Sequence, residues 1–193
     1  MTTAASSWLR VLPGHLMPLE EYDALPDEVS RRAELVEGVL HVSPSPRVRH
    51  QHLARRLADA LDTGLAAGWG TLLAVDVLIE GGPAPTVRQP DVVVVRSACL
   101  AGDRQRLDPT DVLAVVEVAS PGSRRTDRVA KRAEYAEVGI PHYAIVEPGP
   151  PVVLTELVLE GGAYRVRGEH RGLARVDLGF ATEVDLDGLD RRP

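Results

Sequence analysis

Three carboxylates stand within or beside valine-rich segments, where charged side chains are unusual. Asp91 opens the segment DVVVVR, Glu117 lies in VVEVAS, and Asp76 lies in LAVDVLI. A buried carboxylate is unfavourable unless it is hydrogen-bonded, paired or bound to a cation. Two carboxylates on neighbouring strands suffice for Mg²⁺, which keeps waters and substrate phosphate oxygens as its other ligands. The pattern predicts a divalent-metal site, with a capped turn as the alternative for Asp91 and a solvated strand edge for Asp76.

Lys131 is the single lysine in a chain whose 22 lysine and arginine residues are otherwise all arginine. This bias makes arginine the default cation, whereas an ammonium is a compact point charge that fits against a water or phosphate oxygen. In a strand, the neighbour of Glu117 on its own face is the inert Ala119. Helical spacing puts Lys131 on one stripe with Asp127 and Tyr135. We therefore predict that Lys131 supplies the cation of the site, with an ordinary surface pair to Asp127 as the alternative and packing as the role of Tyr135.

His50 lies in a basic amphipathic segment that precedes these strands. Residues 47–64 place His50, Leu53 and Leu57 at helical spacing on one apolar stripe;. This position predicts a core histidine with one satisfied nitrogen. The alternative is a residue at the mouth of a cleft that contacts phosphate or orients a water.

A succession of strands and helices must position these residues. The apolar runs 71–80, 89–97 and 111–120 are nearly continuous, which is typical of strands covered on both faces, so we expect them to form the middle of a sheet;. The other predicted elements are a short helix before Pro26, a strand or hairpin at 33–46, helices at 47–64 and 123–139, a strand at 140–148, a hairpin at 152–168 and a strand near 174–178. The order of strand, helix and strand over 111–148 indicates a crossover connection.

Composition limits the class of protein. With 193 residues, of which 44% are hydrophobic, the chain can build one core, and we predict a single domain over residues 1–193;. A net charge of −6 argues against a protein that coats nucleic acid, but not against a local basic cleft;. The apolar runs are far shorter than the ~20 residues of a membrane span. The lone Cys99 excludes an internal disulfide, so we expect a soluble cytoplasmic protein without membrane partners;.

An ordered set of motifs makes the chain similar to a known family. The motifs are ELVEG at 34–38, His50 at the start of a helix, RQPD at 88–91, EVASPGS at 117–123, Asp127, Lys131, Tyr135, and GIPHY at 139–143. This set resembles the Uma family (Uma-two type) of restriction endonucleases, in the PD-(D/E)XK nuclease superfamily, and it covers residues 17–165. The resemblance implies an α/β, restriction-endonuclease-like fold. Its mixed central sheet is flanked by helices, and here we expect a C-terminal β-hairpin as well.

The resemblance also implies roles for individual residues. Asp91 matches the motif aspartate that follows proline, and Glu117 matches the second metal-binding acid. Alanine occupies the place of the usual lysine two residues later, so the lysine of the site would be Lys131 on the following helix. Glu34 resembles the acidic residue that the early segment of the fold adds to the metal site, with Glu37 as the alternative.

The implied activity is hydrolysis of DNA phosphodiester bonds with Mg²⁺ or Mn²⁺. The ion would polarise a phosphodiester oxygen and activate a water, and Lys131 would position that water or neutralise developing charge. Asp127 and His50 are possible accessory residues. Possible contacts to backbone phosphates are Arg47, Arg49, Arg124 and Arg125;. A solvated helix face is the alternative for these arginines.

Two other functions fit the same residues. The chain could be a non-catalytic nucleic-acid or protein-binding module on the same fold, which the acidic net charge favours slightly. It could also be a metal-dependent phosphoesterase that acts on nucleotides. A serine hydrolase has little support, because Ser120 and Ser123 lie outside any GxSxG elbow;. A homodimer is expected by analogy with nucleases that cut two strands.

Overall fold

The computed structural model describes residues 14–101, 104–120, 123 and 126–191. The described residues divide into two compact units, one within Met1–Ser45 and Glu80–Arg88 and the other within Pro46–Ile79 and Gln89–Pro193. A single domain over 1–193, with its nuclease-like core over 17–165, stays a prediction. No helix in the described part of the chain is long and apolar enough to cross a membrane.

The first unit contains two short helices and a small antiparallel sheet. Its elements are α2 (Leu19–Asp23), α3 (Asp27–Ser30), β1 (Ala33–Val36), β2 (Val39–Val42) and β5 (Thr86–Arg88). β1 and β2 form a hairpin that turns at Glu37 and Gly38, whose φ angles of 50° and 73° lie in the left-handed region;. β5 pairs with β1 through Leu35 and Val87, and both are buried. The hairpin prediction is confirmed, whereas β5 is an additional strand.

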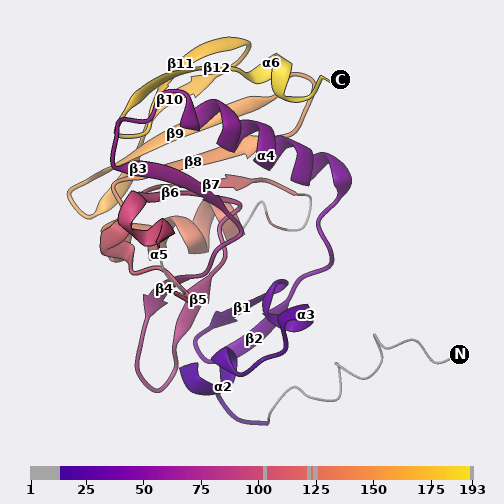
Figure 1. The fold of residues 1–193 in the computed structure, drawn as a ribbon, viewed down its shortest axis with the longest axis vertical. Helices are drawn as coiled ribbons and strands as arrows, with labels where there is room; N and C mark the ends of the chain where they lie inside the picture. The colour runs from indigo at the N-terminus through magenta and orange to yellow at the C-terminus, as the bar shows by residue number, and fades with distance from the viewer. Residues whose placement is uncertain (1–13, 102–103, 121–122, 124–125, 192–193) are drawn as a thin grey trace, which may run out of the picture. The chain divides into compact units, whose positions relative to one another are not determined.

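The second unit contains a six-stranded mixed sheet (Figure 1). In spatial order its strands are β10 (Ala163–His170), β9 (Val153–Glu160), β8 (His142–Glu147), β7 (Val112–Val118), β6 (Val92–Arg96) and β3 (Trp69–Leu73). β7 and β8 are parallel, and the other neighbouring pairs are antiparallel. The connection within the parallel pair runs through the π-helical turn η3 (Thr126–Lys131) and α5 (Arg132–Glu137);. This architecture is the predicted α/β class, a mixed sheet with a hairpin of β9 and β10.

Helices cover both faces of this sheet. α4 (Val48–Asp62) packs Leu53 and Leu57 into one cluster of buried residues, together with Val94 of β6. Tyr135 of α5 belongs to a second cluster, together with Val93. Since successive strand residues point to opposite faces, the two clusters lie on opposite sides of the sheet. Coverage on both faces explains why these strands are continuous runs of apolar residues.

Smaller elements complete the second unit. They are the 3₁₀ turns Ser97–Leu100 and Pro109–Asp111, the antiparallel strands β11 (Leu173–Asp177) and β12 (Ala181–Asp185), and the short helix α6 (Leu186–Leu189). Val176 of β11 and Val184 of β12 join the same buried cluster as α4. The predicted strand near 174–178 is therefore β11, and its partner β12 is an additional strand.

Two of the predicted elements are divided in the structure. The run 71–80 is not one central strand, because the chain turns at Ala74 (φ 50°) and separates β3 from β4 (Val77–Glu80). β3 lies at the edge of the six-stranded sheet, so its predicted central place is wrong. The helix expected at 123–139 consists of η3 followed by α5. Helical periodicity is similar for a π turn and an α-helix over so few residues, so the sequence pattern does not separate them.

Candidate active site

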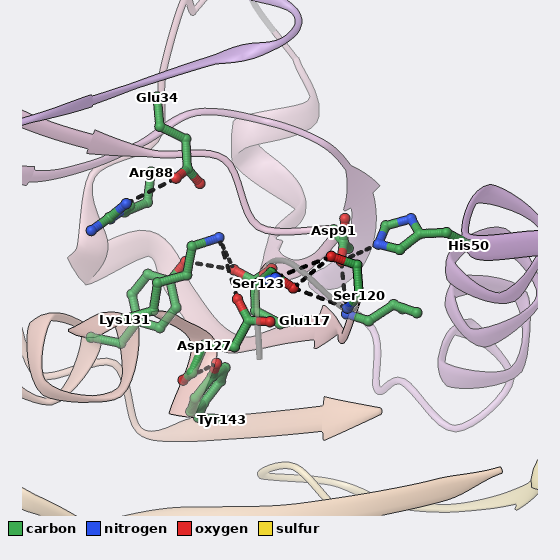
Figure 2. A network of polar contacts seen from close by, with 12 residues as sticks. Glu34, His50, Arg88, Asp91, Glu117, Ser120, Ser123, Asp127, Lys131 and Tyr143 are labelled. Atoms are coloured by element: carbon green, nitrogen blue, oxygen red, sulfur yellow. Dashed lines mark hydrogen bonds and ion pairs between the residues drawn. The ribbon is translucent and has the colours of Figure 1, made fainter. Parts of the chain in front are cut away.

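Glu117 and Lys131 form a buried ion pair in the second unit (Figure 2). Lys131 Nζ donates to Glu117 Oε1 at 2.8 Å. The side chain of Lys131 is 8% exposed and that of Glu117 is 5% exposed, so water screens this pair very little;. Glu117 comes from β7, and Lys131 ends the turn η3. Lys131, which follows β7 in the chain, thus reaches the carboxylate on β7, whereas Ala119 is buried among apolar residues.

Tyr135 contacts the same carboxylate oxygen. Its hydroxyl donates to Glu117 Oε1 at 2.9 Å, and the side chain is fully buried. The sequence predicts packing for Tyr135, and the structure adds this hydrogen bond. The available signal is its position one turn after Lys131, which brings both side chains to one face.

Asp127 lies on the other side of Lys131 within η3. Its carboxylate oxygen Oδ1 is 4.0 Å from Lys131 Nζ, and the residue is 1% exposed. The solvated surface pair considered from the sequence is therefore wrong, because both partners are buried. The backbone carbonyl of Asp127 accepts a hydrogen bond from the hydroxyl of Tyr143 at 2.9 Å. Burial, together with the charges of Glu117 and Asp127, raises the pKa of Tyr143 well above its usual range, so the hydroxyl is a neutral donor.

Asp91 precedes β6 and reaches the neighbouring strand β7. Its Oδ2 accepts the backbone N–H of Val118 at 2.7 Å and lies 3.1 Å from His50 Nε2. Val118 directly follows Glu117, so Asp91, just before β6, is hydrogen-bonded to the residue next to Glu117 on β7. A metal ion shared by the two acids stays a prediction. The turn-capping alternative for Asp91 is also partly right, since its carboxylate does bind a backbone amide, although that amide belongs to another strand.

His50 extends from the first turn of α4 toward Asp91. Its side chain is 18% exposed, and Nδ1 is buried with no hydrogen-bond partner in the described part of the chain. The hydrogen bond to Asp91 raises the pKa of His50, burial opposes this effect, and the charge of Glu117 adds to it. His50 is therefore a largely buried histidine with one satisfied nitrogen, and the partner of that nitrogen is a candidate metal ligand.

The carboxylates of Asp91 and Glu117 fit a hard cation that needs few protein ligands. Oδ2 of Asp91 is used by Val118 and His50, which fixes the direction of its second oxygen. The described residues contain no group of three or more histidine, cysteine or acidic side chains that could hold a metal ion. An all-protein cage is therefore a poor fit to them. A Mg²⁺ or Mn²⁺ ion that takes most of its ligands from water and phosphate fits better.

Glu34 lies in the first unit, on β1, and pairs with Arg88 of β5. Arg88 Nη1 donates to Glu34 Oε2 at 2.9 Å, and the side chains of Arg88 and Glu34 are 5% and 18% exposed. The alternative residue, Glu37, is exposed at the hairpin turn. A buried arginine thus orients Glu34, whereas Glu37 is a solvated turn residue. Glu34 as a third metal ligand stays a prediction.

The arginines predicted to contact phosphate differ in their surroundings. Arg47 is exposed at the start of α4. Arg49 donates to both oxygens of Asp190, at 2.8 and 2.7 Å, and to the carbonyl of Pro148 at 3.0 Å. Arg49 therefore links α4 to the C-terminal segment. Arg124 and Arg125 lie outside the described residues.

Two polar pairs near the strand ends have structural roles. Asp76 accepts a hydrogen bond from Gln89 Nε2 at 2.9 Å, which links the segment after β3 to the one before β6. Ser123 Oγ accepts the backbone N–H of Ser120 at 3.0 Å and lies 3.1 Å from Ser120 Oγ. These serines close the turn after β7, a structural role that a search for nucleophiles does not find.

Comparisons with known proteins identify the family of the chain and a shared fold. The Uma2 family model, described as "Putative restriction endonuclease", matches residues 19–183. Among solved structures, the chain is similar to a crystal structure of "a putative nuclease belonging to DUF820" from Anabaena variabilis ATCC 29413. The two share 14% identity with a TM-score of 0.65, over 92% of this chain and 98% of that chain, so the likeness shows a common fold. No curated protein matches.

Proposed function

Because the chain belongs to the Uma2 family, described as "Putative restriction endonuclease", we propose that it is a Mg²⁺- or Mn²⁺-dependent endonuclease that hydrolyses phosphodiester bonds in DNA. One observation carries this proposal: Lys131 reaches the buried carboxylate of Glu117 at 2.8 Å, and Asp91 accepts the backbone N–H of the next residue on that strand, Val118. Two acids can hold a metal ion for phosphodiester hydrolysis, and a lysine beside them can neutralise the charge that develops.

Asp91 and Glu117 would hold the ion, with Glu34 as a predicted third ligand. When bound, the ion supplies Lewis-acid polarisation of a phosphodiester oxygen and lowers the pKa of a water. Asp91 is kept in place by the Val118 amide and His50, so its carboxylate is oriented before substrate arrives. Asp91 would therefore hold the ion without rearranging, and the positive charge of the ion would offset the negative charge that develops on the phosphate.

Lys131 would act beside the acids. Its ammonium is held by Glu117, next to Asp127, in a buried environment where a positive charge acts strongly on a developing negative charge;. We propose that it positions the attacking water or neutralises charge on the phosphate. Arg47 remains a proposed contact to the DNA backbone because it is exposed at the start of α4;.

A plasmid-cleavage assay with Mn²⁺, with and without chelator, tests the proposal. We expect the wild type to nick or linearise DNA only when metal is present, and Asp91→Ala and Lys131→Ala to be inactive. Asp59→Ala is the matched control, since Asp59 is 56% exposed on α4 and forms a surface pair with Arg55;. Equal cleavage by wild type, Asp91→Ala and Lys131→Ala would refute the assignment.

Titration calorimetry separates this function from a non-catalytic binding module on the same fold. The net charge of −6 favours the module, because a nuclease on long DNA benefits from a broad basic surface;. We expect Mn²⁺ to bind the wild type and to bind Asp91→Ala more weakly. A wild type that binds no Mn²⁺ at about millimolar concentration would favour the module, since weak metal sites saturate in that range.

A further inference from the structure

The turn η3 is the element that brings Lys131 to Glu117. Its six residues, Thr126–Lys131, form a π-helical turn that passes directly into α5. π turns are rare and are frequently found at functional sites. Within η3, Lys131 is closer to Glu117 Oε1, at 2.8 Å, than to Asp127 Oδ1, at 4.0 Å. The ammonium is therefore directed to the strand rather than to the acid on its own turn.

Two buried hydroxyl groups hold the ends of this arrangement. Tyr135, which follows η3, donates to the same Glu117 oxygen as Lys131. Tyr143 on β8 donates to the backbone carbonyl of Asp127, near the start of η3, at 2.9 Å. The rings of Tyr135 and Tyr143 meet edge to face with centroids 5.4 Å apart. The start of η3 is thus tied to β8, and β8 pairs with β7, the strand that carries Glu117.

We propose that Tyr143 is a positioning residue for the reaction: through the Asp127 carbonyl it fixes η3 so that Lys131 is held at Glu117. This inference rests on the proposed function for its catalytic consequence. The Tyr143 hydroxyl donates to the Asp127 carbonyl, so its effect on Lys131 passes through the backbone of the turn. A displacement of about 1 Å at a reacting group is enough to lower the rate up to a hundredfold.

Tyr143→Phe is the variant that tests the inference, and Tyr164→Phe is its matched control. Phenylalanine keeps the ring in its packing and removes only the hydroxyl. Tyr164 is also buried, its hydroxyl donates to a backbone carbonyl, that of Ile140, at 2.7 Å, and its ring lies 5.5 Å from that of Tyr143. Both variants therefore lose one buried hydrogen bond of the same kind, but Ile140 lies outside η3.

Single-turnover plasmid cleavage and amide hydrogen exchange are measured on all three proteins. We expect Tyr143→Phe to lower the maximal single-turnover rate by about tenfold to a hundredfold, while the enzyme concentration that gives half of this rate changes by less than about twofold, because chemistry and not DNA binding depends on the Lys131 position. Amides of 126–132 should exchange about tenfold faster in this variant, because local opening becomes easier. Tyr164→Phe should stay near the wild type in both measurements. Equal effects of the two variants would overturn the inference.

The exchange measurement keeps this inference separate from the proposed function. If the wild type does not cleave DNA, the endonuclease proposal fails, and faster exchange at 126–132 in Tyr143→Phe alone still supports the anchoring of η3. If Tyr143→Phe is unfolded at the assay temperature, exchange in the wild type decides. In the wild type, the amides of η3 should exchange at rates close to those of β8, because the two open together. Exchange in η3 that is many times faster than in β8 would overturn the inference.

Discussion

Replacing Lys131 with arginine keeps the positive charge of the site but changes its shape. The ammonium is a compact group 2.8 Å from Glu117 Oε1, on a residue that is 7% exposed. A guanidinium is planar and larger, so it does not fit the same space without moving its neighbours. The substitution therefore tests whether the site needs only a positive charge or needs that charge at the exact position of the Lys131 ammonium.

The cost in stability follows from the burial of the pair. Inserting extra atoms into a packed site costs about 1–3 kcal/mol, which for a chain of this size lowers Tm by about 2–12 °C. Lys131→Met removes the charge and leaves Glu117 without its cation, a loss of about 3–5 kcal/mol. We expect Lys131→Arg to be the more stable of the two variants, while both lose cleavage by about a hundredfold to a thousandfold.

The assay combines thermal unfolding with single-turnover cleavage in Mn²⁺, below the lowest Tm of the set. Arg128→Lys is the control, because Arg128 lies on the same turn but is 57% exposed and pairs with Glu147. We expect this reverse exchange to leave both Tm and the cleavage rate unchanged. If Lys131→Arg cleaves within about threefold of the wild type, charge alone suffices and the positional role assigned to Lys131 is wrong.

Three further predictions concern stability. Burial lowers the pKa of His142 below its ordinary 6.5, so the folded state disfavours protonation of this residue and loses stability as pH falls through 6.5;. His142→Gln should remove this loss. Parallel curves of unfolding free energy against pH for the variant and the wild type would contradict the prediction. Ala74 has a φ of 50°, so Ala74→Gly should raise the free energy of unfolding in urea by about 0.5–1 kcal/mol, and a decrease would exclude relief of strain;. Tyr135→Phe should cost about 1.5–3 kcal/mol, because it removes a donor to the charged Glu117, against about 0.5–1.5 kcal/mol for Tyr22→Phe, whose hydroxyl donates to a neutral carbonyl; equal losses would show that the charge of Glu117 does not strengthen the hydrogen bond;.

Local pattern was enough to predict much of the sheet and part of the site. Val-rich runs without alternation indicate strands buried on both faces, and β6 and β7 are such strands;. The period of a strand places Ala119, which has no charge, beside Glu117. The period of a helix places Lys131 on one stripe with Asp127 and Tyr135. These inferences hold because burial and periodicity are properties of consecutive residues.

The place of a strand in the sheet could not be predicted in the same way. β3 is apolar but lies at the edge, since β6 is its only neighbour among the described strands. Likewise β5 has three residues and pairs with a strand about fifty positions earlier, so no local period marks it. Strand order depends on contacts between distant segments, and composition does not encode which segments meet.

The sequence by itself determined which residue types are available for chemistry and which face of its element each one occupies. Only the tertiary structure decided the partners: His50 with Asp91, Tyr135 and Lys131 on one oxygen of Glu117, and Arg49 with Asp190. A hydrogen bond needs two groups within about 3 Å, and that distance is set by sheet order and helix packing over separations of 14 to 141 residues;. For this reason the sequence predicts candidate residues, while the fold decides which of them are in contact.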